Sequence, residues 1–179
     1  RLELRVLLRL GDDVSTDELL PAGARVLPFR SNVPRIAEFA FEGIDDGYAD
    51  RARALREAGG SHALVAGRNY GQGSSRGHAA LAPRTLGLRV VLARDFARLH
   101  RQNLVNFGVL PLLLQDAENA RAIDAEDVLV LSGLHDALRD DRRDITLSCG
   151  DRSVAARHAL SPRAREIVLA LIKITPYSV

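Results

Sequence analysis

Short apolar runs separated by glycine-rich turns fill the first two thirds of the chain. Residues 2–9 partly alternate between charged and apolar side chains, which predicts an opening strand. Residues 62–67, 89–94 and 109–114 are nearly continuous apolar runs, the last one interrupted by Pro111. Runs of this length without alternation are typical of strands that are buried on both faces of a parallel sheet.

Helical patterns lie between these strands. Apolar positions at helical spacing predict three helices, and glycine ends each of them: 34–58, 76–87 and 96–108. Residues 11–23 are rich in Gly, Asp, Ser, Thr and Pro and predict a loop that can hold one helical turn. Residues 67–75 predict a glycine-rich loop. The order strand, loop, helix, strand, helix, strand indicates an α/β fold with a parallel core.

The last third of the chain changes character. The acidic residues 116–127 predict a solvated face, and residues 161–172 predict a terminal helix with Ser161 as N-cap and Pro162 at its first position. Three short strand candidates lie between these segments: 128–131, 144–149 and 152–157. Because we find no repeat, low-complexity stretch or linker, we predict a single domain over residues 1–179.

Composition narrows the class of protein. Hydrophobic residues make up 46% of the 179 residues, enough for a substantial core, and the formal net charge is +2. Aromatic residues make up 4% and basic runs are short, so we do not expect a nucleic-acid interface, which combines basic clusters with stacking aromatics. No apolar run approaches the roughly 20 residues of a membrane span, and the first ten residues lack the apolar core of a signal peptide.

The chain has one cysteine, Cys149. It cannot form an internal disulfide, and it cannot supply the several thiolates that a zinc or iron–sulfur site requires. We interpret it as a small buried apolar residue and expect a reducing, cytoplasmic setting. The chain begins without Met, which favours the tail of a longer protein over a separate small subunit.

The most informative segment is GRNYGQGSSRGHAA, residues 67–80. It follows a predicted buried strand and opens a helix, so its backbone N–H groups are expected to face open space as an anion site. Gly71 and Gly73 allow a positive φ or a close approach to a ligand. Next to them, Ser74 and Ser75 supply two hydroxyls. Arg76 can form a bidentate pair with a carboxylate.

Other glycine-rich motifs fit this segment less well. A P-loop needs a lysine before its Ser or Thr, and a dinucleotide fingerprint needs a third glycine at a fixed spacing; both are missing. Gly73 to Gly77 does match the pattern of a nucleophile elbow around Ser75. A serine hydrolase with a histidine base therefore stays open as an alternative.

A second segment, residues 15–32, combines a Ser/Thr/Asp cluster with apolar residues. Such a cluster ordinarily caps a turn, and Asp17 is then the expected capping side chain. Arg30 is compatible with an ordinary solvated arginine. Taken alone, this segment does not indicate catalysis.

Together these segments resemble the C-terminal swivel domain of the aconitase family, which includes aconitases, homoaconitases and the small subunits of isopropylmalate isomerases. The matching pieces are Ser15-Thr16-Asp17 with Pro21-Ala22-Gly23, Phe29-Arg30, residues 67–84 and residues 94–112. The resemblance implies an α/β swivel domain with a three-layer β/β/α arrangement and a mostly parallel core sheet.

The resemblance also implies roles for single residues. Ser74 is expected to be the catalytic base, an alkoxide that takes a proton from the carbon next to a carboxylate. Ser75 and Arg76 are expected to bind a substrate carboxylate and to stabilise that alkoxide. Arg30 corresponds to an arginine that grips a second carboxylate, and Asp17 to an aspartate that orients an arginine.

In the family, the hydroxyl leaves with the help of a [4Fe–4S] cluster that other domains hold. The resemblance therefore implies a cluster-binding aconitase domain in the same chain or a large subunit as partner. It implies a small-molecule tricarboxylate as substrate, converted through its dehydrated form, as in citrate and isocitrate. Arg30 favours such a substrate over isopropylmalate, because burying an unpaired guanidinium against an isopropyl group is costly.

Some neighbouring residues depart from the family pattern or support the site. The departures are Glu18, Gln72 and Gly77, none of which removes a group assigned to proton transfer. For the residues on the helices behind the loop we predict structural roles: His78, Arg98 and His100. A non-catalytic carboxylate-binding relative, a homoaconitase and an isopropylmalate isomerase small subunit stay open as alternatives.

Overall fold

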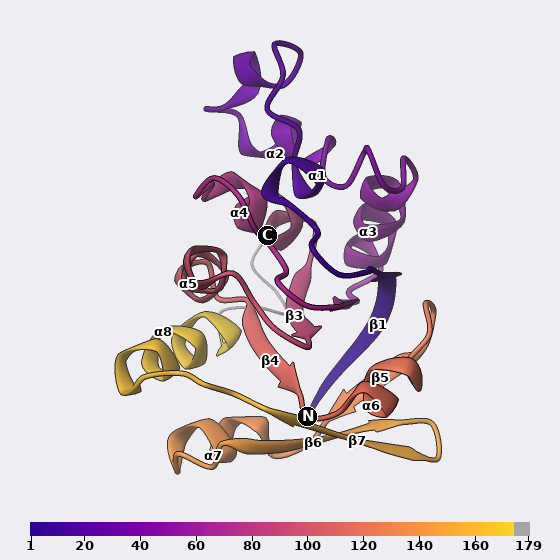
Figure 1. Ribbon diagram of the computed structural model, residues 1–179, viewed down its shortest axis with the longest axis vertical. Coiled ribbons are helices and arrows are strands. Elements are labelled where there is room, and N and C mark those ends of the chain that lie inside the picture. The colour runs from indigo at the N-terminus through magenta and orange to yellow at the C-terminus, as the bar shows by residue number, and fades with distance from the viewer. Residues whose placement is uncertain (174–179) are drawn as a thin grey trace.

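Seven strands pair into one closed sheet in the computed structural model, which describes residues 1–173 (Figure 1). The strands are β1 (Leu2–Arg9), β2 (His62–Ala66), β3 (Leu88–Ala93), β4 (Leu110–Leu114), β5 (Val128–Leu131), β6 (Asp144–Cys149) and β7 (Arg152–Arg157). Around the barrel their order is β1-β2-β3-β4-β7-β6-β5. The apolar and alternating runs of the sequence therefore become the strands that they predict.

The sheet is mixed and closed, which differs from the expected mostly parallel core in separate layers. Strands β1 to β4 pair in parallel, whereas the other four pairings around the barrel are antiparallel. The reason lies in β6 and β7, in which buried and exposed residues alternate. Their apolar face packs against the inside of the parallel strands, and pairing at both ends removes the open edges of the sheet.

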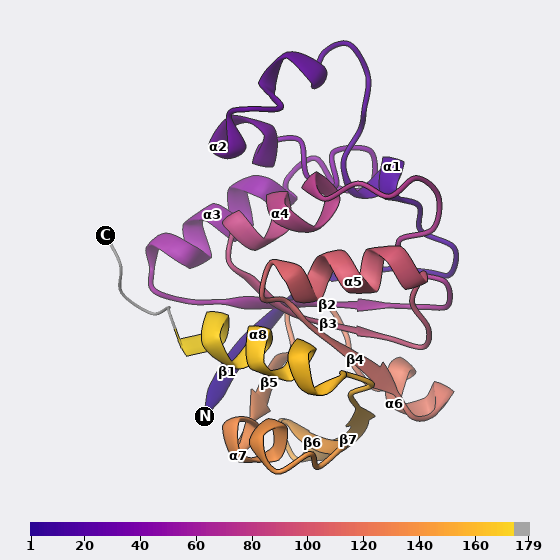
Figure 2. The same cartoon turned by 90° about the vertical axis from the view of Figure 1, so that its left-hand side faces the viewer.

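Helices α3 (Tyr48–Glu57), α4 (His78–Thr85) and α5 (Arg98–Asn106) cover one side of the parallel strands (Figure 2). The helices are α1 (Thr16–Leu19), α2 (Val33–Ala37), α3 (Tyr48–Glu57), α4 (His78–Thr85), α5 (Arg98–Asn106), α6 (Ala117–Arg121), α7 (Leu134–Arg139) and α8 (Pro162–Lys173), with a 3₁₀ turn η1 (Leu27–Phe29). The sequence patterns predict α4, α5 and α8, and Ser161 Oγ accepts from Ala164 N (3.2 Å), as expected of an N-cap. The sequence interpretation missed two helices: α6, which lies within the acidic segment 116–127, and α7, which follows β5.

The expected helix over residues 34–58 is broken into α2 and α3. Between them, Phe41 has a positive φ of 59° and Asp45 Oδ1 accepts from Gly47 N (3.0 Å). Such a local bond gives the backbone an alternative to the helical pattern. The interruption lets α2 turn away and carry the 24–45 region to the top of the molecule in Figure 1.

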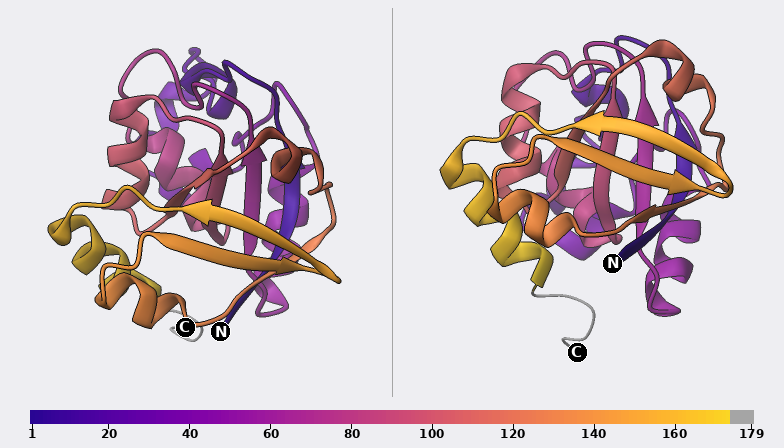
Figure 3. Two further views of the ribbon diagram at one scale, coloured as in Figure 1. Left: turned by 60° about the horizontal axis from the view of Figure 1, so that its bottom comes forward. Right: turned by 90° about the horizontal axis from the view of Figure 1, so that it is seen from below.

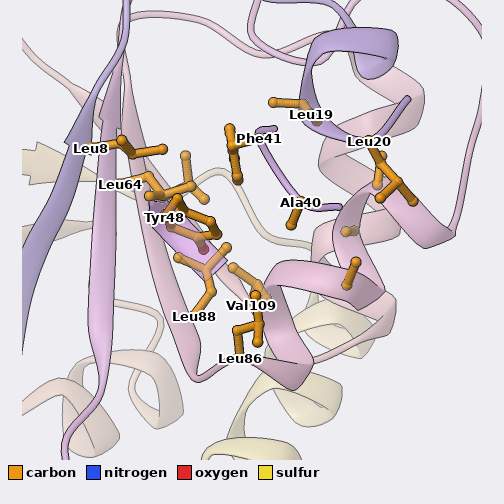
Figure 4. Packing of buried hydrophobic residues seen from close by; sticks show 14 of the residues in the cluster. Leu8, Leu19, Leu20, Ala40, Phe41, Tyr48, Leu64, Leu86, Leu88 and Val109 are labelled. Atoms are coloured by element: carbon orange, nitrogen blue, oxygen red, sulfur yellow. The ribbon is translucent and has the colours of Figure 1, made fainter. Parts of the chain in front are cut away.

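Two hydrophobic cores lie on the two faces of the parallel strands. The inner core fills the barrel with side chains from all seven strands. The outer core lies between β1–β3 and the helices, where Leu8, Leu64 and Leu88 face Tyr48 and Phe41 (Figure 4). The β6–β7 hairpin crosses the barrel on the side opposite the helices α3 and α4, as the views from below show (Figure 3). With both faces covered, β2 and β3 are buried along their whole length.

The parallel arrangement brings three loops to one end of the barrel. Strands β1, β2 and β3 run in the same direction, so the segments that follow them start side by side. These segments contain residues 10–18, 67–77 and 94–97. None of the helices in residues 1–173 is long and apolar enough to cross a bilayer.

Burial lowers the pKa of three histidines, His62, His100 and His158, which should make stability depend on pH. Burial lowers the pKa of His62 to about 3, with a smaller contribution from Arg89, and the pKa of His100 to about 4. Between these values and about 6.5 the unfolded chain binds protons that the folded chain excludes, so the free energy of unfolding falls as the pH is lowered. We expect a loss of about 2 kcal/mol for each of His62 and His100 at pH 5 relative to pH 8.

Urea unfolding at pH 8, 7, 6 and 5 measures this dependence. His100→Gln should make the decline between pH 6.5 and pH 5 shallower, since one of the excluded protonations is removed. A free energy of unfolding that stays constant over this range would contradict the prediction.

Candidate active site

The segments after β1 and β2 are joined by backbone hydrogen bonds as if they continued the sheet. The bonds run from Gly67 N to Gly11 O (3.0 Å), from Asp13 N to Arg68 O (2.9 Å), from Gly71 N to Val14 O (2.8 Å) and from Thr16 N to Gln72 O (2.9 Å). Ser15 and Gln72 also form an isolated parallel bridge. Two segments almost 60 residues apart in the sequence are therefore held together by sheet-like hydrogen bonds, and we call them the paired loops (11–16 and 67–72).

Polar side chains reinforce the paired loops. Asp12 Oδ1 accepts from Arg68 N (2.7 Å), and Asn69 Nδ2 donates to Asp13 Oδ1 (2.9 Å). Gln72 Nε2 donates to Asp13 O (2.7 Å), so this departure from the family pattern has a structural role. The sequence interpretation missed Asp12, Asp13 and Asn69. Their contribution depends on contacts that no local pattern reveals.

Thr16 connects the paired loops to the serine pair. Its Oγ1 is buried and donates to Ser74 O (3.0 Å), which fixes the backbone at the first of the two serines. The sequence interpretation missed Thr16 as well. One buried hydroxyl thus sets the position of Ser74 relative to α1.

The cap of α1 differs from the expected one. Ser15 is the N-cap, its Oγ accepts from Glu18 N (3.3 Å), and the Glu18 carboxylate accepts from Ser15 N (2.7 Å) in a capping box. These bonds from Ser15 lower the pKa of Glu18. The prediction of Asp17 as the capping side chain is wrong, because Ser15 already occupies that role. The Ser-x-x-Glu spacing was the signal for it.

Asp17 instead forms an ion pair with Arg76. Asp17 Oδ1 lies 2.5 Å from Arg76 Nη1, and the Arg76 side chain is 27% exposed while that of Asp17 is 66% exposed. A pair this open to water contributes little to folding. The ion pair instead fixes a position: it holds the Arg76 guanidinium beside the serines and leaves part of that guanidinium accessible to solvent.

Ser74 and Ser75 lie on the surface beside Arg76. Neither hydroxyl, nor the backbone N–H of Ser74, Ser75 or Arg76, has a hydrogen-bond partner within residues 1–173. Helix α4 begins at His78 with Gly77 as an N-cap that makes no side-chain bond. Helix α4 starts two residues later than predicted, so the free donors come from the loop ahead of it, with the positive end of the helix dipole behind them.

Arg30 follows η1 and lies on the same side of the molecule as Arg76. His78 Nε2 donates to Arg30 O (3.0 Å), which ties the η1 segment to the first residue of α4. The Arg30 residue is exposed, and its guanidinium has no partner in the described part of the chain. The structure therefore brings Arg30, Arg76 and the serine pair to one end of the barrel, and His78 has the structural role predicted for it.

His100 supports the glycine-rich loop from below. It is 2% exposed, its ring lies edge-on to Tyr70 with centroids 5.3 Å apart, and neither ring nitrogen has a partner among the described residues. The low pKa of His100 keeps the ring neutral at physiological pH. Gly71, with φ of 81°, lies directly on this ring. His100 therefore has the structural role predicted for it, through its contacts with Gly71 and Tyr70.

The hydrolase alternative lacks the geometry it needs. A nucleophile elbow places its serine on a sharp strand-to-helix turn, whereas here the long loop 67–77 separates β2 from α4. No histidine of residues 1–173 bonds to Ser75, and both candidate bases are occupied or enclosed: His78 binds Arg30 and His100 packs under Gly71. We therefore set the hydrolase aside.

The described residues do not form a metal centre. No group of three or more His, Cys, Asp or Glu side chains is gathered within residues 1–173. Cys149 is buried on β6, where its thiol donates to Asp127 Oδ2 (3.2 Å). Burial and this carboxylate raise the pKa of Cys149, which is the opposite of what a metal-binding thiolate requires.

Comparisons with known proteins identify a family that matches part of the chain. A family model described as aconitase C-terminal domain matches residues 38–117. This interval includes the 67–77 loop, whereas Asp17 and Arg30 precede it.

Two relatives and one solved structure cover larger parts of the chain. A 3-isopropylmalate dehydratase small subunit 2 from Archaeoglobus fulgidus is 36% identical over 70% of this chain and 71% of its own length. A putative mitochondrial aconitate hydratase from Emericella nidulans is 33% identical over 93% of this chain, but the chain spans only 24% of that protein. The crystal structure of a 3-isopropylmalate dehydratase from Methanocaldococcus jannaschii aligns with a TM-score of 0.74 at 25% identity, covering 94% of this chain and 88% of that one.

Gly71→Ala tests the contact between the glycine-rich loop and His100. An added Cβ would lie 2.2 Å from His100 Cδ2, on a residue with positive φ, so we expect a loss of about 2–5 kcal/mol in the free energy of unfolding. Gly73→Ala is the matched control. It also has positive φ (94°), but its nearest neighbour is Thr16 Oγ1 at 3.5 Å, so we expect only about 1–2 kcal/mol.

Urea unfolding of both variants decides between packing and backbone strain. Equal losses for Gly71→Ala and Gly73→Ala would mean that the His100 contact contributes nothing beyond the strain at positive φ.

Proposed function

The chain belongs to the aconitase C-terminal domain family, and on that premise we propose that it is the substrate-binding, proton-abstracting domain of a hydro-lyase. The relatives it matches carry the names of hydro-lyases, aconitate hydratase and 3-isopropylmalate dehydratase. The observation that carries the proposal is the serine pair with its unoccupied backbone N–H donors, next to an Arg76 that Asp17 holds in place. A metabolite carboxylate is the ligand that this arrangement suits best.

In the proposed chemistry, Ser74 acts as the base. As an alkoxide it takes the proton from the carbon next to a carboxylate, which leaves a neutral hydroxyl on Ser74 and the electron pair on the substrate. A serine hydroxyl is too weak an acid to ionise unaided, so the alkoxide needs positive charge and donors nearby. Arg76, the loop N–H groups and the start of α4 supply them from this chain, while Ser75 hydrogen-bonds the carboxylate.

We propose a tricarboxylate as the substrate, with Arg30 binding a second carboxylate. An exposed guanidinium without a partner, held to α4 through its backbone, supports this assignment. An isopropyl group would leave this charge uncompensated in the closed site. The match to an isopropylmalate dehydratase small subunit over 71% of its length supports the alternative of an isopropylmalate isomerase subunit.

The [4Fe–4S] cluster of such an enzyme does not fit this chain. Its one cysteine is buried on β6 and bonded to Asp127, and no other ligand group is gathered in the described residues. We propose that a partner domain or large subunit holds the cluster. The chain spans about a quarter of the length of two aconitate hydratases that it matches, which is in keeping with a partner in the same polypeptide.

Ser74→Ala tests the proposed base. In the assembled enzyme we expect turnover to fall by about 10²- to 10⁴-fold while the affinity for substrate changes little, because a methyl group removes the proton acceptor but not the carboxylate contacts. Steady-state kinetics with citrate, isocitrate and 3-isopropylmalate, and calorimetric titration of the substrate, measure the two quantities. Ser153→Ala, an exposed serine on β7, is the matched control. Turnover within twofold of the wild type for Ser74→Ala would rule out Ser74 as the base.

Arg30→Lys tests the second carboxylate contact. Because the planar fork is lost while the charge is kept, we expect KM for a tricarboxylate to rise about 10- to 100-fold with kcat largely retained. The same variant should leave KM for 3-isopropylmalate nearly unchanged. A wild-type enzyme that prefers 3-isopropylmalate, with KM insensitive to Arg30, would favour the isopropylmalate alternative.

A further inference from the structure

A second candidate site lies at the opposite end of the barrel from the serine pair. A cavity of about 1130 Å³ opens there, near the amino ends of β1 and β3. Its apolar lining includes Leu4, Leu55, Leu134 and Leu138, from β1, α3 and α7. Arg56 and Arg89 also line it, and we call it the Arg89 cavity. Its volume is comparable with that of pockets that enclose small organic molecules.

Arg89 is a buried charge without a counter-ion. Its residue is 8% exposed, and within residues 1–173 its side chain makes one hydrogen bond, from Nη1 to Leu88 O (3.3 Å). No carboxylate in the described chain lies within ion-pair distance of it. Burying an unpaired guanidinium is strongly unfavourable, so a structure that keeps one at a cavity wall gains if an anion enters the cavity.

Neighbouring positive charges act on Arg89 in addition to its burial. Burial, then Arg84 and Arg56, lower the pKa of Arg89 to about 10, which still leaves it cationic at physiological pH. The neighbouring His62 is neutral, because burial keeps its pKa at about 3. Within residues 1–173, no carboxylate forms an ion pair with Arg89 that would offset these positive charges.

The acidic residues at the cavity wall do not neutralise Arg89. Glu3 pairs with Arg1 (3.6 Å), and Asp136 Oδ1 lies 3.5 Å from Nδ1 of the adjacent His135, which forms an ion pair only when it is protonated. Glu57 is an exposed residue on the last turn of α3. These carboxylates line the cavity without forming an ion pair with Arg89, and their charge selects against highly charged anions.

We propose that the Arg89 cavity binds a small organic anion, with its carboxylate on Arg89 and an aliphatic body against the leucines. A bidentate guanidinium–carboxylate pair satisfies the buried charge, and the leucines take the hydrocarbon out of water. The site lies away from the proposed catalytic serines and is independent of their assignment. Occupancy would join the amino ends of β1 and β3 to α3 and α7, which line the same cavity.

Calorimetric titration of the intact protein with hexanoate tests the proposal, with hexanol and inorganic phosphate as comparison ligands. We expect saturable binding of one hexanoate per chain, and no binding of hexanol or phosphate. Arg89→Met should weaken hexanoate binding at least about tenfold, since it removes a charged hydrogen-bonding partner. Arg53→Met is the matched control, because Arg53 lies on α3 outside the cavity lining and pairs with Asp50.

Two further measurements distinguish the Arg89 cavity from the serine site and from a purely structural role of Arg89. Arg76→Met should retain hexanoate binding, whereas binding to the serine site would be lost in that variant. The melting temperature of Arg89→Met should equal or exceed that of the wild type, because an unpaired buried charge is replaced by an apolar side chain. Hexanoate binding that survives Arg89→Met, that is lost in Arg76→Met, or that phosphate replaces would overturn the proposal, as would the absence of binding to the wild type.

Discussion

The parallel pairing of residues 11–16 with residues 67–72 is the constraint on which the candidate active site depends. It extends the β1–β2 hydrogen bonds beyond the ends of the strands, so the loops are held with the regularity of a sheet. Thr16 then fixes Ser74, and Asp17 fixes Arg76, from the helical turn that continues the first loop. Without the pairing, the serines and the arginine would sit on a free glycine-rich loop, and ordering it would consume binding energy from the ligand.

Closure of the barrel makes this pairing possible. The parallel strands β1–β4 need cover on both faces, and the antiparallel strands β5–β7 provide it on the inside while the helices provide it outside. The rigid core beneath the loops includes Tyr70 and His100, neutral and packed against Gly71. Functional groups placed on loops are only as precise as the scaffold that supports them, and here that scaffold includes β2 and β3, which are buried along their whole length.

The two ends of the barrel manage charge in different ways. At the carboxyl ends of the strands, Arg30 and Arg76 remain accessible, so water solvates them until a ligand arrives. At the amino ends, the largely buried Arg89 lines a cavity, and within residues 1–173 its side chain bonds to one backbone carbonyl. Exposed arginines lower the free energy of unfolding little and leave a cation available for the proposed carboxylate contacts. Burial of the unpaired Arg89 is unfavourable for folding, and a bound anion would offset that cost.

Local sequence determined the strands, the helices α4, α5 and α8 and the glycine-rich loop, because apolar periodicity, caps and glycine positions are properties of neighbouring residues. The sequence motifs also carried the family resemblance. That resemblance pointed to five site residues: Ser74, Ser75, Arg76, Arg30 and Asp17. Tertiary structure alone decided that the sheet closes with antiparallel strands, that Asp17 meets Arg76 while Ser15 caps α1, and that Thr16 bonds to Ser74. It also decided that Arg89, one residue in an otherwise apolar strand, lines a cavity. These outcomes join residues tens of positions apart, and only packing, which no local pattern encodes, brings such residues together.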